Sequence, residues 1–336
     1  LLEVLNLMTT EGELDEDQEA EIKELIDDVS KVNDSFKKST PEESVQIQLD
    51  FTDEPEVKEE PKFEFTAPTP VKKEKVRPNI LYPEIPSSER NNFVITDDNL
   101  GVGAPLERYE NNVAAIRLLK KLESEKRLAT PEEQEVLSRY VGWGGLADCF
   151  DEKHSKYLEL KSLLDETEYE AARESTLTAF YTPPVVIRSM YKALENMNFK
   201  TGNILEPSCG IGNFMGMLPE SLGSSKIYGI ELDSISSRIA QQLYQNSSIA
   251  SRGYEATDLP DSFFDCAIGN VPFGQFKVLD KRYDKHNFLI HDYFFARTLD
   301  KVRPGGIVAF ITSKGTLDKE NPNVRKYIAQ RADLIG

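Results

Sequence analysis

An apolar run that ends in a polar turn carries the residues with the most specific chemistry, Asp265-Cys-Ala-Ile-Gly-Asn-Val-Pro-Phe273. A planar exocyclic amine such as N6 of adenine is a poor nucleophile because its lone pair is delocalised into the ring. The side-chain oxygen of Asn270 and the carbonyl of Val271 could accept its two N–H bonds and favour a more tetrahedral, nucleophilic nitrogen. A plain turn is the alternative interpretation, because Asn-x-Pro commonly breaks strands.

The two residues that follow would complete such a corner. Pro272 would fix the turn and remove one competing donor. Phe273 offers a flat face on which an extruded base can stack, worth roughly 1–3 kcal/mol per base. With an activated methyl donor no metal or strong base is needed, because in-line placement supplies most of the acceleration. The predicted catalytic residues are therefore Asn270, Val271, Pro272 and Phe273.

A bend with two glycines follows an earlier apolar run, Ile204-Leu-Glu-Pro-Ser-Cys-Gly-Ile-Gly-Asn-Phe214. Gly210 and Gly212 would allow a close approach of the backbone to a ligand. A dinucleotide fingerprint would need a third glycine where Met215 stands. The carboxylate of Glu206 would repel a pyrophosphate but suits the cationic amine of S-adenosylmethionine. The predicted cofactor residues of this motif are Glu206, Pro207, Gly210, Gly212 and Phe214, and a structural bend without a ligand is the alternative.

A second carboxylate ends the next apolar run, Lys226-Ile-Tyr-Gly-Ile-Glu231. It stands about twenty residues after the glycines, where an acidic side chain accepts ribose hydroxyls in dinucleotide folds. We therefore predict that Glu231 binds the ribose of the cofactor. Asp233 is instead predicted to be the N-cap of the following helix.

Short apolar runs alternate with helical patterns from residue 176 onward. Strands are expected at Asn203–Leu205, Lys226–Ile230, Asp265–Ile268 and Gly306–Thr312. Helices are expected near Pro184–Asn196, Phe214–Leu218, Ser234–Gln245 and His291–Val302. This alternation predicts an α/β fold with a mostly parallel sheet, in which ligands lie at the carboxyl ends of the strands.

Residues 91–175 are expected to form a helical region in front of this domain. An apolar stripe begins at Asn111, and Thr130-Pro-Glu-Glu133 is an N-cap, a first-turn proline and a capping-box glutamate that start a helix through Tyr140. The turn Gly142-Trp-Gly-Gly145 holds the only tryptophan. Trp143 could fill the core, or its turn could border the cofactor or a nucleic acid.

The net charge of −18 is concentrated in residues 1–90, which hold 11 basic and 24 acidic side chains. The remainder holds 29 basic and 34 acidic side chains, so its charge neither supports nor excludes a DNA substrate. A short acidic helix is expected within residues 1–35. Residues 36–90 are rich in Pro, Glu, Lys, Ser and Thr and are predicted to be a disordered linker. We treat residues 1–90 as an acidic leader and linker.

The remaining composition fits a cytoplasmic protein. The three cysteines are far apart, with no CxxC pair and no histidine at metal-ligand spacing, which predicts a reducing compartment and no metal. No apolar run is long enough to span a bilayer, and no signal-peptide pattern is present. The chain begins at Leu1 and ends at Gly336, and we expect it to be a piece of a longer polypeptide that lacks the last strands of its sheet.

The corner at residues 270–273 resembles the [DNS]-P-P-[YF] motif of the N6-adenine DNA methyltransferases, which implies a Rossmann-like class I S-adenosylmethionine-dependent fold. Thr178-Ala-Phe-Tyr-Thr-Pro-Pro184 is similar to the FxTP motif of that family, and the motif order matches its gamma arrangement. The resemblance implies that Phe180 and Thr182 border the cofactor. It also suggests Asp258 for the adenine amino group of the cofactor, with Glu255 nearby. Val271 departs from the family, because it replaces the usual first proline.

A closer resemblance extends over roughly residues 95–336. Gly142-Trp-Gly-Gly145, Phe180-Tyr-Thr-Pro183 and Gly269-Asn-Val-Pro-Phe-Gly274 together look like the large methyltransferase–helicase proteins of plasmids and integrative conjugative elements. The resemblance implies DNA as a partner and a helicase region in the same full-length polypeptide. No helicase region or target-recognition domain is found in this sequence, so the methylated site cannot be derived from it.

Two alternatives to an adenine-specific DNA methyltransferase remain open at this level. The same chemistry suits RNA or the amide of a protein glutamine, and the domain could also be a non-catalytic scaffold of a mobile-element helicase protein. A loop after the corner carries Lys277, Lys281, Arg282, Lys285 and His286. It could contact phosphates or could simply be a solvated loop.

Overall fold

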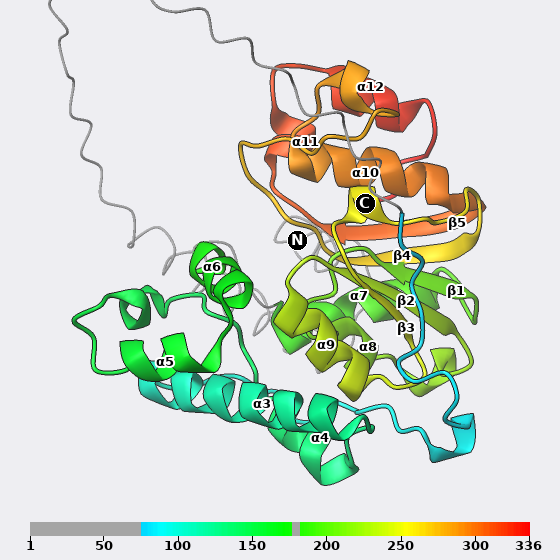
Figure 1. The fold of residues 1–336 in the computed structure, drawn as a ribbon. Coiled ribbons are helices and arrows are strands. Elements are labelled where there is room, and N and C mark those ends of the chain that lie inside the picture. Colours follow the sequence, from blue (N-terminus) through cyan, green and yellow to red (C-terminus); the bar gives the residue numbers. More distant parts are fainter. Residues whose placement is uncertain (1–74, 177–181) are drawn as a thin grey trace, which may run out of the picture. The chain divides into compact units, whose positions relative to one another are not determined.

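A five-stranded parallel sheet forms the centre of the fold (Figure 1). The computed structural model describes residues 75–176 and 182–336. The described residues up to Asp333 belong to one compact unit. The strands lie in the order β3-β2-β1-β4-β5. Their bounds are β1 Asn203–Glu206, β2 Lys226–Glu231, β3 Ser248–Ser251, β4 Phe264–Asn270 and β5 Val302–Ile311.

The predicted α/β fold class is confirmed, and four of the five strands lie where the apolar runs predict them. The sequence analysis missed β3. This strand has four residues, of which only Ile249 and Ala250 are buried. Such a short apolar pair gives too weak a periodic signal to be recognised without its neighbours in the sheet.

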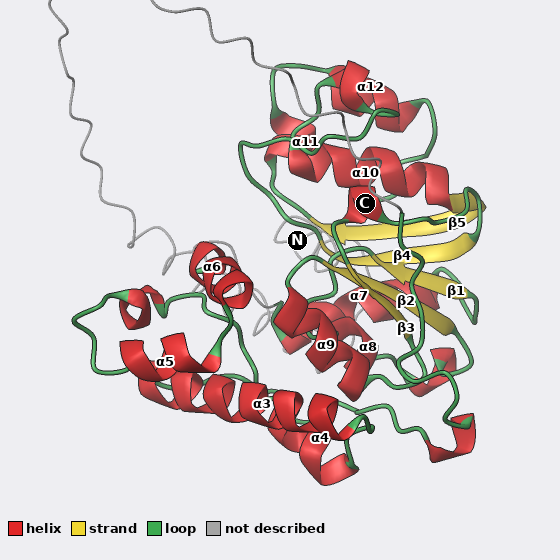
Figure 2. Cartoon of the chain, viewed as in Figure 1, coloured by secondary structure: helices red, strands yellow, loops and turns green. Residues whose placement is uncertain are grey.

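Helices cover both faces of the sheet (Figure 2). The helices that alternate with the strands are α7 Pro184–Asn196, α8 Asn213–Gly216, α9 Ser234–Leu243, α10 Ile290–Lys301, α11 Gly315–Asp318 and α12 Asn323–Ala329. The earlier helices are α3 Pro105–Glu125, α4 Pro131–Leu137, α5 Tyr157–Leu163 and α6 Glu166–Ser175. Short 3-10 turns are η1 Ser87–Glu89, η2 Ala147–Phe150, η3 Glu220–Leu222, η4 Tyr254–Ala256 and η5 Asp284–His286.

Alternate residues of the strands contribute to different cores, because side chains along a strand point to opposite faces. Ile204 of β1 packs with α7 and α8, whereas its neighbour Leu205 packs with α10 and α12. In β4, Cys266 and Ala267 divide in the same way. The sheet is therefore buried on both sides, as expected for a parallel sheet in an α/β protein.

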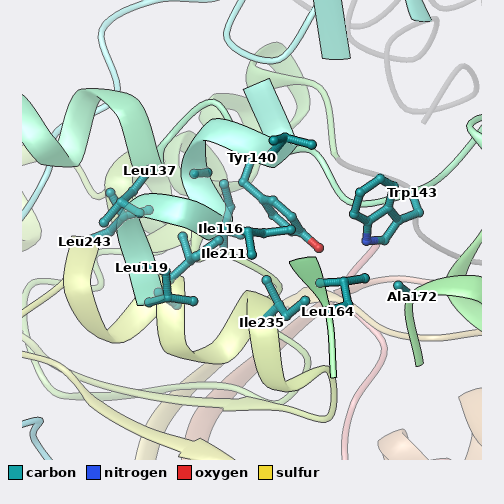
Figure 3. Packing of buried hydrophobic residues seen from close by; sticks show 14 of the residues in the cluster. Ile116, Leu119, Leu137, Tyr140, Trp143, Leu164, Ala172, Ile211, Ile235 and Leu243 are labelled. Atoms are coloured by element: carbon teal, nitrogen blue, oxygen red, sulfur yellow. The ribbon is translucent and has the colours of Figure 1, made fainter. Parts of the chain in front are cut away.

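The helical region packs on the sheet domain through one cluster of buried side chains that includes Trp143, Ile211 and Ile235 (Figure 3). The interpretation of Trp143 as a core residue is confirmed, because it is 1% exposed and its ring meets Tyr109 and Phe150 edge-on. The bend residue Ile211 belongs to the same cluster. The tryptophan turn and the glycine bend therefore contribute to the same hydrophobic core.

The predicted caps are present, with small shifts in the helix ends. Thr130 and Glu133 form the predicted capping box, and Asp233 accepts a hydrogen bond from the Ser236 amide as the N-cap of α9. The helix that begins after Thr130 ends at Leu137 instead of continuing through Tyr140. Its last turn is replaced by the tight turns that lead into the tryptophan segment.

The predicted disordered linker extends too far. Residues 75–90 lie along β3 and the segments on either side of it: the amide of Ile249 in β3 donates to the Asn79 carbonyl at 3.0 Å, and the guanidinium of Arg90 donates to the Gln245 carbonyl, before β3, at 2.7 Å. Main-chain bonds along an edge strand leave no apolar signature in sequence, so the composition of this segment was misleading. The predicted helix in residues 1–35 and the rest of the leader lie outside the described residues.

Candidate functional site

The glycine bend and the Asn270 corner lie side by side at the carboxyl ends of the sheet strands. They follow β1 and β4, which are neighbouring parallel strands. The Ser208 hydroxyl in the bend donates to the Asn270 carbonyl at 2.8 Å, and a Cβ placed on Gly269 would lie 3.5 Å from Cγ of Glu206. The chain runs from β1 outward to β3 and then returns to β4. This reversal of strand order is where open α/β sheets bind their ligands.

The two positions of the bend require glycine for different physical reasons. Gly210 has φ +55° and Gly212 has φ +90°, conformations that L side chains rarely adopt. A Cβ on Gly212 would come within 2.3 Å of the Tyr244 ring, so only glycine leaves room for that ring here. Gly210 instead turns its amide to the carboxylate of Glu231, which accepts it at 2.8 Å. The bend therefore joins the ends of β1 and β2.

Glu206 ends β1 as a buried carboxylate. The residue is 2% exposed, and its Oε2 atom has no hydrogen-bond partner among the described residues. Burial, followed by the nearby charge of Glu231, raises the pKa of Glu206 well above its ordinary value. An ionised carboxylate is costly in such a place unless it is paired with a cation. The position fits the amine of an amino-acid ligand.

Glu231 at the end of β2 is oriented by main-chain amides. Its two oxygens accept from the amides of Gly210 and Asp233, each at 2.8 Å. Burial raises the pKa of Glu231 to about 7, although these hydrogen bonds act in the opposite direction. A carboxylate oxygen can accept more than one bond, so the fixed group retains capacity for ribose hydroxyls.

The Asn270 side chain presents a buried acceptor at the end of β4. Its Oδ1 atom has no hydrogen-bond partner in the described part of the chain. The Val271 amide donates to the Ile311 carbonyl at 3.1 Å, so β5 fixes the corner without the usual first proline. Val271 is buried, Pro272 is half-buried, and the Phe273 ring is 44% exposed. The corner can accept N–H groups and offers an aromatic face beside them.

The other predicted cofactor residues are placed less directly. Phe180 lies outside the described residues, and Thr182 is buried just before α7. The carboxylate of Asp258 accepts from Arg77 at 2.7 Å, and this bond lowers the pKa of Asp258. Arg77 belongs to the segment that was assigned to the linker. The assignment of Asp258 to the cofactor's adenine remains a prediction.

Two of the basic side chains in the loop after the corner are engaged in contacts within the protein. Arg282 is taken up by ion pairs with Asp261 and Asp300 at 2.8 and 2.9 Å. His286 stacks on Phe288 with ring centroids 5.0 Å apart. The cations that remain available for phosphates are Lys277, Lys281 and Lys285, all exposed.

The sequence analysis also missed a buried anchor of this loop. Asp280 accepts from the Arg297 guanidinium at 2.7 Å and from the Tyr293 hydroxyl at 2.9 Å. The same guanidinium donates to the Thr257 carbonyl at 2.8 Å, one residue before Asp258. Arg297 therefore joins the loop after the Asn270 corner to the loop after β3. A charged residue inside the apolar pattern of α10 was the available signal, since buried charges are almost always paired.

The described residues contain no group of acidic, histidine and cysteine side chains that could hold a metal ion. Cys149, Cys209 and Cys266 are buried free thiols. No helix within residues 75–176 and 182–336 is long and apolar enough to cross a membrane.

The known proteins to which this chain is similar include a phage restriction-defence protein and a viral methyltransferase. No family model matches it. It is 28% identical over 235 residues to the "Defense against restriction protein B" of Escherichia phage P1, covering 68% of this chain but 9% of that protein. It is 33% identical over 94 residues to the "Type II methyltransferase M.CvrRI" of Paramecium bursaria Chlorella virus XZ-6E, covering 28% of this chain and 24% of that enzyme.

Among solved structures, a Listeria monocytogenes protein assigned as a class I S-adenosylmethionine-dependent methyltransferase is 15% identical, with a TM-score of 0.40. The match covers 68% of this chain and 74% of that one. This chain thus spans less than a quarter of the length of each of the two viral relatives.

Proposed function

We propose that this chain transfers a methyl group from S-adenosylmethionine to N6 of adenine in DNA. One observation carries the proposal: Oε2 of the buried Glu206 carboxylate and Oδ1 of Asn270, both without partners among the described residues, lie at the ends of neighbouring strands at the switch point of the sheet. The first suits a cationic amine and the second suits an amine donor. A methyl donor and a planar amine can therefore meet between them.

The strand ends at β1 and β2 would hold the cofactor. Glu206 would pair with its amine, and Glu231 would accept from its ribose hydroxyls. Phe180, Thr182 and Asp258 would border its methionine and adenine ends, as the resemblance implies. When bound, S-adenosylmethionine supplies a methyl group on a sulfonium that is already a good leaving group.

The corner after β4 would act on the substrate amine. The Asn270 oxygen and the Val271 carbonyl would accept its two N–H bonds, which raises the electron density on the nitrogen. The nitrogen lone pair would form the bond to the methyl carbon as the carbon–sulfur bond breaks and leaves its electron pair on the sulfur. One of the hydrogen-bonded protons would then pass from the nitrogen to solvent water. Phe273 would stack on the base. The Asn270 oxygen is covered in the free protein, so the groups around it must move when the base enters.

DNA as the substrate is supported by the viral type II methyltransferase among the relatives. The adenine specificity rests on the corner motif alone. A helicase region in the same full-length polypeptide and a cytoplasmic location are further parts of the proposal. The match to a small part of a long phage protein agrees with a modular arrangement.

A methyl-transfer assay tests the substrate class. Radiolabelled S-adenosylmethionine is incubated with the chain and with DNA, RNA or protein, and the nucleosides are then separated. We expect the label in DNA, as N6-methyl-2′-deoxyadenosine. Label only in RNA or protein would reject the DNA proposal, and binding of cofactor without transfer to any substrate would favour a scaffold.

Cofactor affinity should depend on pH through Glu231. The ionised carboxylate is the better acceptor for two hydroxyls, and the pKa of Glu231 is about 7 in the free protein. Affinity should therefore fall as the pH drops below about 7. Glu231→Ala should weaken binding by about 10- to 100-fold above this pH, the loss expected for hydrogen bonds to a charged group, and should remove the part of the pH dependence that arises near pH 7.

Calorimetry with S-adenosylmethionine at several pH values measures both effects. Glu220→Ala is a matched control, because Glu220 is an exposed glutamate in η3, before the opposite end of β2. Unaltered affinity of the Glu231 variant would reject its assignment to the ribose.

A further inference from the structure

Two exposed phenylalanines flank a glycine directly after the catalytic corner. Phe273 is 44% exposed and Phe276 is 52% exposed, whereas the other described phenylalanines, apart from Phe263, are buried or half-buried. A Cβ on Gly274 would lie 2.6 Å from the Phe276 ring, so the ring rests against the glycine backbone. The absence of a side chain at 274 therefore allows the second ring to stand beside the corner. Phe276 makes no ring contact that would explain an aromatic residue at this place within the described chain.

Hydrogen bonds hold the backbone of Phe276 near the carboxyl ends of the strands, where the candidate site also lies. Its carbonyl accepts from the amide of Ile290, the first residue of α10, at 2.9 Å. The next residue, Lys277, donates to the Asn287 side chain at 2.6 Å. Since α10 begins where the loop from β4 ends, both bonds fix the ring near the carboxyl ends of the strands.

Cations accompany these rings. Lys277 is exposed, and so is Lys314, which follows β5. The register pairs Asn270 with Ile311, so Lys314 leaves the sheet three residues beyond the catalytic corner. Lys314 forms no ion pair with any described residue. Exposed aromatic faces beside lysines are the combination with which proteins bind unpaired nucleic-acid strands.

We propose that Phe276 is a second stacking residue, which holds the base adjacent to the target adenine while Phe273 holds the target. The proposal rests on the proposed DNA substrate and deepens it. Enzymes that act on an extruded or single-stranded base also contact the flanking nucleotides, and a second ring on the same short segment would hold one of them. Lys277 and Lys314 would contact the phosphates on either side.

A cycle of changes in protein and DNA tests the contact. The DNA is a fluorescein-labelled single-stranded oligonucleotide of thymidines with one central adenine, together with versions that carry an abasic site immediately 5′ or 3′ of that adenine. Binding to the wild-type chain and to Phe276→Leu is measured by fluorescence anisotropy. We expect one abasic site, and Phe276→Leu on intact DNA, each to weaken binding by about 5- to 100-fold. The variant should lose nothing more on that abasic DNA.

Phe263→Leu is the matched control, because Phe263 is 37% exposed and precedes β4 at the opposite edge of the sheet. Its affinity should equal that of the wild type, and thermal unfolding should show that both variants are folded. Additive losses on both abasic strands, or wild-type affinity of Phe276→Leu, would overturn the proposal. Binding to a duplex of the same sequence is measured as well. A loss confined to the duplex would also overturn the proposal, because that result would indicate that Phe276 inserts between base pairs. Methyl transfer by the wild-type chain tests the proposed function separately.

Discussion

Replacing Asn270 by alanine should lower the rate of methyl transfer by about 100- to 1,000-fold while cofactor affinity stays near that of the wild type. The expected size is that for removing one preorganised hydrogen-bonding group from a reacting centre. Asn270 ends β4, and its side-chain oxygen has no other partner among the described residues. Its loss would therefore affect the substrate amine more than the fold. Single-turnover transfer and calorimetry measure the two quantities.

Two variants make this result specific. Asn246→Ala removes an exposed asparagine just before β3, at the other edge of the sheet, and should leave transfer unchanged. Asn270→Asp keeps an acceptor of similar shape and should retain more activity than Asn270→Ala. Wild-type turnover by Asn270→Ala would show that this oxygen does not bind the amine. A parallel loss of cofactor binding would instead place Asn270 in the cofactor site.

The sequence predicted the main features of the site because its signals are local. A strand that ends in a carboxylate and is followed by glycines can be recognised within about ten residues. Glu206 and Glu231 lie at strand ends as expected, and Gly210 lies in the bend after β1. Parallel pairing then requires that these ends meet at one edge. The juxtaposition of the bend with Asn270 needed only the additional fact that β1 and β4 are neighbours.

The features that were missed depend on contacts between distant segments. The pairing of Asp258 with Arg77 joins residues 181 positions apart, and the bonds of residues 75–90 to β3 are mostly main-chain bonds. Neither leaves a pattern in a short window of sequence. The basic loop shows the converse error. Composition counts Arg282 as a free cation, although distant carboxylates, Asp261 and Asp300, neutralise it.

Arg297 offers the largest expected effect on stability. Its ion pair with Asp280 is 2.7 Å long, and the two side chains are 3% and 8% exposed. Removing one member of a buried pair leaves the other charge without a partner, which typically costs about 3–5 kcal/mol. Arg297→Met should therefore lower the free energy of unfolding by about 3 kcal/mol or more. Urea denaturation followed by circular dichroism measures this change.

The chain supplies its own control for that measurement. Arg282 also pairs with two carboxylates, but its side chain is 50% exposed, so Arg282→Met should cost less than about 1 kcal/mol. Adding Asp280→Asn to Arg297→Met removes the unpaired charge and should restore part of the stability. Equal losses for the two arginine variants would show that burial does not govern the strength of these pairs. Because Arg297 also holds the Thr257 carbonyl, its variant should loosen the loop that carries Asp258 together with the loop after the corner.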